Sequence, residues 1–250
     1  MKKGAIVLAS GGLDSTVTAY YVKKKLSYNP IIFLFFDYGQ KTLKQEEFFA
    51  RKQALLLKAS FVKIDLTWIK KISRSLIHHG KNVVISRKDL NSTKKVGNWY
   101  VPARNTLFIS CALAFAESLF LDGRHYDIFL GFKNEGQLHY PDTTSPFVRA
   151  FNRLKKSAIQ SDSLILAPLL KYDKDQVILL GKELGVDYRK TYSCYLGAGK
   201  KHCGICMNCR LRQEGFYWAH LPDPTHYVKK SEDYRDYTHL GRDNLKNRTS

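Results

Sequence analysis

Ser10-Gly11-Gly12-Leu13-Asp14-Ser15-Thr16 is the stretch that decides the fold. It follows an apolar run over residues 5–9 and precedes a helical pattern over residues 14–25. The sequence therefore predicts a buried strand, a glycine turn and the start of a helix in direct succession. The two glycines allow positive φ and a close approach of the backbone, so successive N–H groups can point at one anion. The first helical turn favours bound phosphate through its dipole and free N–H groups, and the hydroxyls of Ser15 and Thr16 add donors. The stretch therefore predicts a phosphate-binding loop.

This loop differs from two well-known phosphate-binding motifs. It lacks the lysine and the spacing of G-x-x-x-x-G-K-[ST], and it does not fit G-x-G-x-x-G. An ordinary strand-to-helix turn would account for two adjacent glycines but not for the whole heptamer. The heptamer SGGLDST resembles the PP-loop of the ATP pyrophosphatase superfamily, whose members cleave ATP to AMP and pyrophosphate and thereby adenylate a substrate. The resemblance implies a nucleotide alpha-hydrolase fold, in which a parallel sheet carries helices on both faces, with ATP as the nucleotide and Mg²⁺ on its phosphates.

Length and composition fit one soluble globular domain. A chain of 250 residues has the size of one domain with room for a small appendage, and its 44% of hydrophobic residues are ample for one sizeable core. No apolar run approaches the roughly 18 residues that span a bilayer. The first residues lead directly into a short strand instead of a signal sequence. We therefore expect a cytoplasmic protein with no membrane partner.

Positive charge dominates the chain. It has 41 Lys and Arg against 22 Asp and Glu, which gives a formal net charge of +19, and the excess is concentrated in residues 68–98 and 189–212. A charge of this size suggests an anionic partner, such as a nucleotide, a nucleic acid or an acidic protein surface. A solvated basic face with no dedicated partner explains it equally well, because charge steers binding without specifying it.

Strand and helix patterns alternate along most of the chain. Predicted strands occupy residues 5–9, 31–36, 61–66, 126–131 and 164–167, and predicted helices occupy residues 14–25, 46–58, 106–121, 147–160 and 173–184. Such alternation predicts an α/β fold with a doubly wound parallel sheet and helices on both faces. We expect residues 1–187 to form this ATP-binding domain, with an irregular basic excursion at 68–98. A small cysteine-containing subdomain at 188–228 and a tail at 229–250 would follow.

Four of the five cysteines form the pattern Cys194-x8-Cys203-x2-Cys206-x2-Cys209. The C-x2-C spacing lets neighbouring thiolates share one tetrahedral ion, and four thiolates leave no open coordination position. The pattern therefore predicts a structural Zn²⁺ site, with an iron–sulfur cluster as the alternative, because four thiolates serve both metals. His202 is interpreted as a neighbour of this site. The fifth cysteine, Cys111, is interpreted as a core residue of the predicted helix 106–121.

Further motifs indicate one family within this superfamily. They are Phe36-Asp37-Tyr38-Gly39-Gln40, Val101-Pro102-Ala103-Arg104-Asn105, Tyr140-Pro141-Asp142, Pro168-Leu169 with Lys174, Ser193-Cys194-Tyr195 and the cysteine pattern itself. Together with SGGLDST they resemble the 7-cyano-7-deazaguanine synthase family in order and spacing. The resemblance implies an ATP-dependent carbon–nitrogen ligase of queuosine-type deazapurine biosynthesis, acting as a homodimer. It would adenylate the carboxylate of 7-carboxy-7-deazaguanine, let ammonia displace AMP to give the amide, and dehydrate the amide to the nitrile in a second activation.

The same resemblance implies roles for individual residues. Asp14, Ser15, Arg104 and Lys174 would be catalytic, with Lys174 approaching the triphosphate. The deazaguanine would contact Arg104, Asn105, Lys133, Tyr140 and Asp142. ATP would contact one strand end, the loop with the helix after it, and the next strand end: Leu8, Ala9, Ser10, Gly11, Gly12, Leu13, Asp14, Ser15, Thr16, Val17, Thr18 and Asp37. From the residues alone, a solvent-facing helix lysine would also explain Lys174, whereas an arginine at a helix start is unfavourable unless it serves an anion.

Two motifs depart from the family pattern. The loop after the fourth strand usually reads approximately G-V-N-x-x-D-x-S-x-Y-P-D-C-R, whereas residues 131–144 read GFKNEGQLHYPDTT. Lys133 replaces the asparagine, Gly136 replaces the first aspartate, and Thr143-Thr144 replace Cys-Arg. Ala103 replaces the glycine of P-G-R-N. These differences leave the ATP motif intact, but they do not fix the acceptor of the activated group or the final product.

Three functions therefore stay open at the level of the sequence. The first is the ligase that uses ammonia. The second keeps deazaguanine adenylation but transfers the acyl group to an amine of a protein, as in relatives from antiviral defence operons; the altered loop 131–144 and the basic segment 68–98 motivate it. The third is a non-catalytic nucleic-acid-binding zinc protein, suggested by the charge and by aromatic residues near the cysteines. The complete PP-loop argues against the third, because binding alone does not require it.

Overall fold

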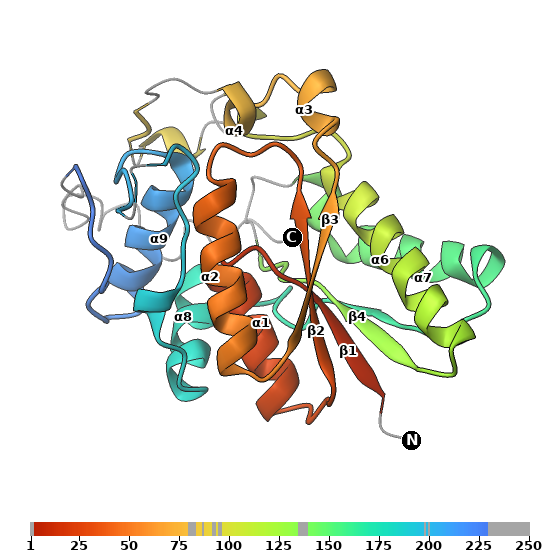
Figure 1. Ribbon diagram of the computed structural model, residues 1–250. Coiled ribbons are helices and arrows are strands. Elements are labelled where there is room, and N and C mark those ends of the chain that lie inside the picture. The colour runs from red at the N-terminus through yellow and green to blue at the C-terminus, as the bar shows by residue number, and fades with distance from the viewer. Residues whose placement is uncertain are drawn as a thin grey trace.

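A parallel sheet of five strands runs through the centre of the molecule. The computed structural model describes residues 3–229 except 80–83, 87, 92, 93, 95, 96, 135–139, 198 and 200 (Figure 1). The strand order is β3–β2–β1–β4–β5, and every neighbouring pair is parallel. The strands are β1 (Gly4–Leu8), β2 (Ile31–Asp37), β3 (Ser60–Asp65), β4 (Tyr126–Phe129) and β5 (Ile165–Leu166).

Helices connect the strands and follow the last of them. The α-helices are α1 (Leu13–Lys24), α2 (Leu43–Leu56), α3 (Ile69–Ile72), α4 (Leu76–His79), α6 (Arg104–Leu121), α7 (Ser145–Ala158), α8 (Lys174–Glu183) and α9 (Met207–Trp218). Short 3₁₀ turns lie at Lys88–Asn91, Pro141–Thr143 and Tyr188–Lys190. The tail beyond residue 229 lies outside the described residues.

The strand order explains the burial of the strands and locates a ligand site. Every residue of β2 is buried, as expected for an apolar strand covered on both faces, whereas β3 at the sheet edge is only partly buried. Strands β2 and β3 lie on one side of β1, and β4 and β5 lie on its other side. Open α/β sheets bind ligands where the strand order reverses, beyond the carboxyl ends of the strands. That point lies here between β1 and β4.

Two hydrophobic cores lie on opposite faces of the sheet. On one face α1, α8 and α9 contribute Val17, Val177 and Phe216 to a core shared with β1 and β2. On the other face α6 and α7 contribute Ile109 and Phe151. Figure 1 shows α1, α2, α8 and α9 on one side of the strands and α6 with α7 on the other. The predicted doubly wound parallel sheet with helices on both faces is therefore confirmed.

Helix α6 is long and apolar enough by length and composition to cross a membrane, with a mean hydropathy of 1.2 and 33% of the stretch buried. Its buried positions Ile109, Ala112, Leu113, Ala116 and Leu119 nevertheless belong to the core between this helix and the sheet. Its position is therefore that of a core helix in a sandwich of helices and strands.

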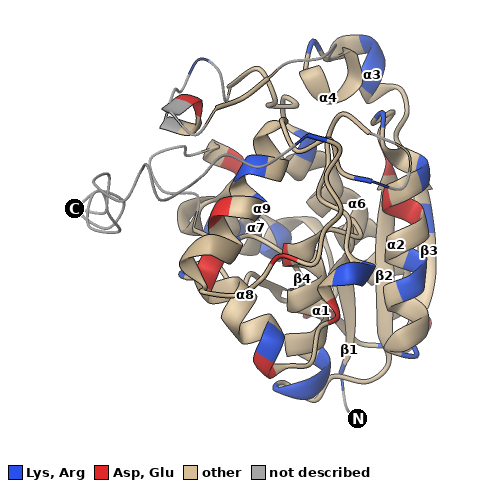
Figure 2. Ribbon diagram, turned by 90° about the vertical axis from the view of Figure 1, so that its left-hand side faces the viewer, with Lys and Arg blue, Asp and Glu red and all other residues tan. Residues whose placement is uncertain are grey.

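The described part of the basic excursion 68–98 is anchored to the rest of the molecule. Ile69, Ile77 and Leu90 are buried in the core on the α6 face. The Ile85 N–H donates to the Ile205 carbonyl oxygen at 2.8 Å, and Arg210 Nε donates to the Ile85 carbonyl oxygen at 2.8 Å. Figure 2 shows the basic residues of α3 and the mixed acidic and basic residues along α2. The excursion thus rests on the cysteine-containing segment, while the proposed domain boundaries stay a prediction.

Candidate functional site

A cavity of about 240 Å³ opens at the carboxyl edge of the sheet. Its wall joins parts of the chain that are far apart in sequence: the ends of β1, β2 and β4, the glycine loop (residues 10–16), the start of α6 and the cysteine segment (residues 192–211). The cavity therefore occupies the ligand position that the strand order predicts, and it connects the predicted phosphate loop with the predicted metal site.

The glycine loop has a conformation that leaves helix α1 open to an anion. Gly11 has φ +70°, and a Cβ there would lie 2.4 Å from the Glu46 carbonyl oxygen, so only glycine fits. Gly12 is the N-cap of α1, and no side chain of the described residues caps this helix start. The hydroxyl oxygens of Ser10 and Ser15 lie 3.1 Å apart on the loop. The first N–H groups of the helix and two hydroxyls thus border the cavity.

Lys174 lies against the glycine loop. Its Nζ donates to both carboxylate oxygens of Asp14 at 2.8 Å, and the two side chains are 11% and 26% exposed. Lys174 is the first residue of α8, whose N-cap Asp173 also accepts a hydrogen bond from Asn134 Nδ2 at 2.7 Å. The loop after β4 therefore fixes the helix start that carries this lysine.

Arg104 reaches the cavity from the start of α6. Its guanidinium carbon lies 5.6 Å from the ring centre of Tyr38 and 5.8 Å from that of Phe108, within the range of cation–π contact. Among the described residues, no carboxylate forms an ion pair with Arg104. Arg104 Nε also donates to Asn105 Oδ1 at 3.3 Å. A partly buried arginine whose described partners are aromatic rings and a neutral amide is a candidate for binding an anionic group.

Asn105 and Asp142 form a second polar element beside Arg104. The Asn105 backbone N–H donates to Asp142 Oδ2 at 3.4 Å, and Asn105 Nδ2 donates to the Asp142 carbonyl oxygen at 3.1 Å. Asp142 Oδ1 is buried and accepts no hydrogen bond from the described residues, and burial raises the pKa of this carboxyl above its usual range. Asp142 does not line the cavity, whereas Asn105 does, so these hydrogen bonds hold Asn105 in the cavity wall.

Ala103 stands before α6 in the left-handed conformation, with φ +54° and ψ 16°. A residue with a Cβ pays about 1–2 kcal/mol for this conformation, whereas glycine does not. We therefore expect Ala103→Gly to raise the free energy of unfolding by about 0.5–1 kcal/mol after the larger unfolded-state entropy of glycine is subtracted. Urea denaturation of both proteins would measure the change, and a loss of stability in the variant would contradict it.

Three of the residues in the loop 131–144 that differ from the family pattern form contacts in the structure. Thr144 is the N-cap of α7, where its Oγ1 accepts a hydrogen bond from the Phe147 N–H at 3.3 Å. Thr143 Oγ1 donates to the Tyr140 carbonyl oxygen at 2.9 Å and borders the cavity. Lys133 is buried in the cavity wall, and its Nζ donates to the Asn134 carbonyl oxygen at 2.9 Å. Gly136 lies outside the described residues.

The structure brings together most of the predicted site residues but not all of them. The cavity wall includes Arg104, Asn105, Lys133, Tyr140 and Lys174, and from the predicted ATP contacts Leu8, Ala9, Ser10, Gly12, Leu13, Asp14 and Ser15. The predicted substrate residue Asp142 lies outside the lining, behind Asn105. Thr16, Val17 and Thr18 are buried in α1, and Gly11 packs against α2, outside the lining. The Asp37 carboxylate accepts a hydrogen bond from the Gly39 N–H at 3.2 Å and lies 3.4 Å from Lys63 Nζ. Asp37 is thus held by its own neighbours.

Several cavity residues were not predicted from the sequence. Tyr38, Phe108 and Tyr192 contribute aromatic surface, and Glu46 contributes a carboxylate. Glu46 could have been found from its pattern, because it shares the buried face of α2 with Ala50, at a spacing of four residues.

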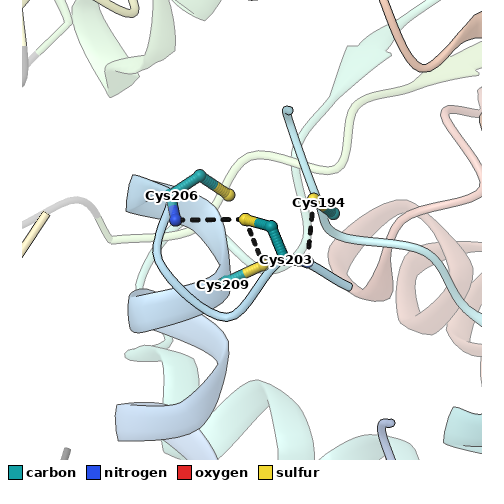
Figure 3. Close-up of side chains that lie close together, drawn as sticks. All are labelled: Cys194, Cys203, Cys206 and Cys209. Carbon is teal, nitrogen blue, oxygen red and sulfur yellow. Dashed lines mark hydrogen bonds between the residues drawn. The ribbon is translucent and has the colours of Figure 1, made fainter. Parts of the chain in front are cut away.

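The four predicted cysteines form a buried cluster. Their sulfur atoms all lie within 4.8 Å of one another, and those of Cys203 and Cys209 are 3.8 Å apart (Figure 3). Zn–S bonds of about 2.3 Å in a tetrahedron separate the sulfurs by about 3.8 Å. Backbone N–H groups donate to three of the sulfurs at 3.3–3.4 Å, as suits thiolate ligands. The four residues therefore fit a closed structural metal site.

Arg212 fixes the segment that leads to this cluster. Its side chain is fully buried, and it donates to Thr191 Oγ1 at 2.8 Å, to Ser193 Oγ at 3.2 Å and to the Tyr188 carbonyl oxygen at 3.1 Å. His202 lies beside the cluster, where its Nε2 accepts a hydrogen bond from the Ser193 N–H at 2.9 Å. Burial lowers the pKa of His202 to about 4, so its ring is neutral at pH 7.

Comparison with known proteins identifies the family. The model of the family described as queuosine biosynthesis protein QueC matches residues 4–220. A 7-cyano-7-deazaguanine synthase of Methanosphaera stadtmanae is 36% identical over 235 residues, which cover 92% of this chain and 100% of the relative. The enzymes of the same name from Methanococcus maripaludis and Methanocaldococcus jannaschii are 35% and 34% identical, each over 90% of this chain and over 98% and 99% of the relatives. The resemblance seen in the motifs is thereby confirmed, and the chain belongs to the QueC family of queuosine biosynthesis proteins.

Proposed function

We propose that this protein is an ATP-dependent ligase that converts 7-carboxy-7-deazaguanine to 7-cyano-7-deazaguanine with ammonia. The observation that carries the proposal is the single cavity, which has the glycine loop and Lys174 in one part of its wall and Arg104 with Asn105 in another. The first part is suited to phosphates and the second to an anionic, hydrogen-bonding heterocycle. The family supports the same reaction, because the relatives are named for its product.

The part of the cavity beside the glycine loop would bind ATP for the adenylation of the carboxylate. A carboxylate is a poor electrophile, and its adenylate is a better one because AMP departs far more readily than oxide. The N–H groups at the start of α1 and the Lys174 ammonium group would hold the phosphates and stabilise charge on the departing pyrophosphate. Mg²⁺ would enter with the nucleotide and neutralise part of its charge. The work of this chain's own residues is positioning and electrostatic stabilisation.

The other part of the cavity would bind the deazaguanine. The Arg104 guanidinium, which pairs with no carboxylate of the described residues, is suited to the substrate carboxylate, which must approach the α-phosphate. Asn105, which Asp142 holds through two hydrogen bonds, would contact the base. The Tyr140 ring, stacked on Tyr100 at a centroid distance of 5.5 Å, extends the aromatic surface. Lys133 would lie at the edge of this region.

A second candidate acceptor is an amine of a protein, with the same adenylation. It is favoured by Lys133 and Thr143, which border the cavity at positions where the family pattern has other residues. Both candidates share the ATP chemistry and differ only in the nucleophile.

Incubation with ATP, ammonium and 7-carboxy-7-deazaguanine separates the two, with the small molecules and the protein both analysed by mass spectrometry. The ammonia ligase should yield 7-cyano-7-deazaguanine and two AMP per nitrile. AMP release with no nitrile, together with a deazaguanine adduct on an added protein, would favour the second candidate. Absence of any deazaguanine-dependent AMP release would overturn both.

A further inference from the structure

Glu46 of α2 places a buried carboxylate in the wall of the cavity. The residue is 8% exposed, and it borders the cavity together with Tyr38 and Arg104. It lies on the core-facing side of α2 with Ala50 and Ala54, where an apolar side chain would pack without a desolvation cost. A carboxylate at this position therefore calls for a function or for compensating partners.

The partners of Glu46 are neutral donors, one on each oxygen. Thr42 Oγ1 donates to Oε1 at 2.5 Å, and Gln40 Nε2 donates to Oε2 at 3.1 Å. The Gln40 amide is itself oriented, because its Nε2 also donates to the Phe36 carbonyl oxygen at 3.1 Å and its Oε1 accepts from the Tyr38 N–H at 2.9 Å. A carboxylate can accept about four hydrogen bonds, so both oxygens keep capacity for a further donor. The group is thus held in place without being saturated.

No ion pair neutralises Glu46 within the described part of the chain, whereas the adjacent Glu47 is paired with Lys63 at 2.8 Å and with Arg51 at 2.7 Å. Burial raises the pKa of Glu46, against the opposing effects of its two hydrogen bonds and of the Arg104 charge. The salt bridges of Glu47 lower the pKa of that carboxyl. Two successive glutamates therefore differ: one is a surface ion-pair partner, and the other is a stronger base that borders the cavity.

We propose that the Glu46 carboxylate takes the proton from the nitrogen nucleophile as it attacks the activated carboxyl carbon. The assignment rests on the proposed function. A C–N bond forms when the free amine attacks, which leaves one proton too many on nitrogen. That N–H bond breaks as the proton moves to a Glu46 oxygen, and the C–O bond breaks as its electron pair departs with AMP. The products are the amide, AMP and a protonated Glu46, which returns its proton to solvent.

This proton transfer is required whether the nucleophile is ammonia or an amine of a protein, because both become cations on forming the new bond. Glu46 is 8% exposed and shares the cavity wall with the aromatic rings of Tyr38, Phe108 and Tyr192. A general base in the cavity wall would therefore accelerate the attack of either nucleophile.

Glu46→Gln is the informative variant, because glutamine keeps the size of the side chain and removes the base. With ammonium as nitrogen source, we expect amide formation to fall by about 10²- to 10⁴-fold. The exchange of labelled pyrophosphate into ATP in the presence of 7-carboxy-7-deazaguanine should persist, because it needs activation only. Hydroxylamine should largely restore product formation, as its adduct loses a proton to water far more readily than the ammonia adduct. Zinc content and thermal unfolding would show that the variant is folded.

Glu47→Gln is the matched control, and it should keep both activities. Equal losses of exchange and amide formation in Glu46→Gln would mean that Glu46 serves the nucleotide or the fold, and would overturn the assignment. Undiminished amide formation from ammonium would overturn it as well. If the unchanged protein shows no deazaguanine-dependent exchange, the proposed function itself fails and this assignment falls with it.

Discussion

Replacing Lys174 with methionine should lower the rate of AMP formation by about 10²- to 10³-fold, the usual cost of one preorganised electrostatic contact to a transition state. Lys174 Nζ lies 2.8 Å from both oxygens of Asp14, beside the open start of α1. Methionine keeps the aliphatic stem, which packs closely against Gly215 of α9, and removes the charge. The Asp14 carboxylate is then left unpaired next to the phosphates. Deazaguanine-dependent AMP release at saturating ATP would measure the effect.

Two further variants separate catalysis from stability in this experiment. Lys182→Met removes an exposed lysine on the same helix and should keep the full rate. Asp14→Asn combined with Lys174→Met removes the unpaired carboxylate, so it should recover the stability that Lys174→Met loses, while the rate stays low. An unchanged rate in Lys174→Met would contradict a role of this lysine in the activation step.

Cys209→Ser should release the metal and disable the cavity. The four sulfurs lie within 4.8 Å of one another, and the segment that they organise supplies Tyr192, Cys194 and Met207 to the cavity wall. Structural zinc contributes about 10–16 kcal/mol to folding in isolated zinc-finger peptides. Here the cysteines are part of a core that also contains many residues of the sheet and of α6. We therefore expect a smaller loss, which still exceeds the about 3 kcal/mol that bounds most single substitutions, with AMP formation falling below detection. Metal analysis and chemical denaturation would measure the two effects.

Cys111→Ser is the control for this variant. Cys111 is half-buried in α6 and lies outside the cluster. Its replacement should keep one zinc per chain and cost no more than about 1 kcal/mol. A Cys209→Ser protein that retains its metal and its stability would contradict the closed four-thiolate site, and bound iron in the unchanged protein would favour a cluster over zinc.

The order of the elements was predictable because it depends on local signals. Apolar runs of strand length alternate with helical patterns, and the strands at Gly4–Leu8 and Ile31–Asp37 lie within one residue of their predicted bounds. Helix starts were less accurate: α2 begins at Leu43 instead of residue 46, and α6 begins at Arg104 instead of residue 106. The start of α6 was missed because Ala103 adopts the left-handed conformation that ends the preceding turn, and no residue type marks that position in this chain. Helix α9 was missed inside the cysteine pattern.

The cysteine cluster and the glycine turn after β1 were predictable for a related reason, since the residues of each are close in sequence. The remainder of the cavity depends on tertiary packing. Nothing local to Lys174 shows that it pairs with Asp14, which is 160 positions away. Nothing local to Asp37 shows that its carboxylate contacts Gly39 and Lys63. Glu46 was overlooked because the large apolar residues of α2 do not mark its buried face: Phe48 and Leu55 are exposed, whereas Glu46 is buried.

The central claim is that this cavity activates a carboxylate by transferring AMP to it, and an oxygen label tests that claim most directly. The protein would be incubated with ATP, ammonium and 7-carboxy-7-deazaguanine whose carboxylate carries ¹⁸O, and the AMP would be analysed by mass spectrometry. Adenylation predicts one ¹⁸O in each AMP, because the carboxylate oxygen leaves with the phosphate. Unlabelled AMP, or cleavage to ADP with the label in inorganic phosphate, would contradict the claim.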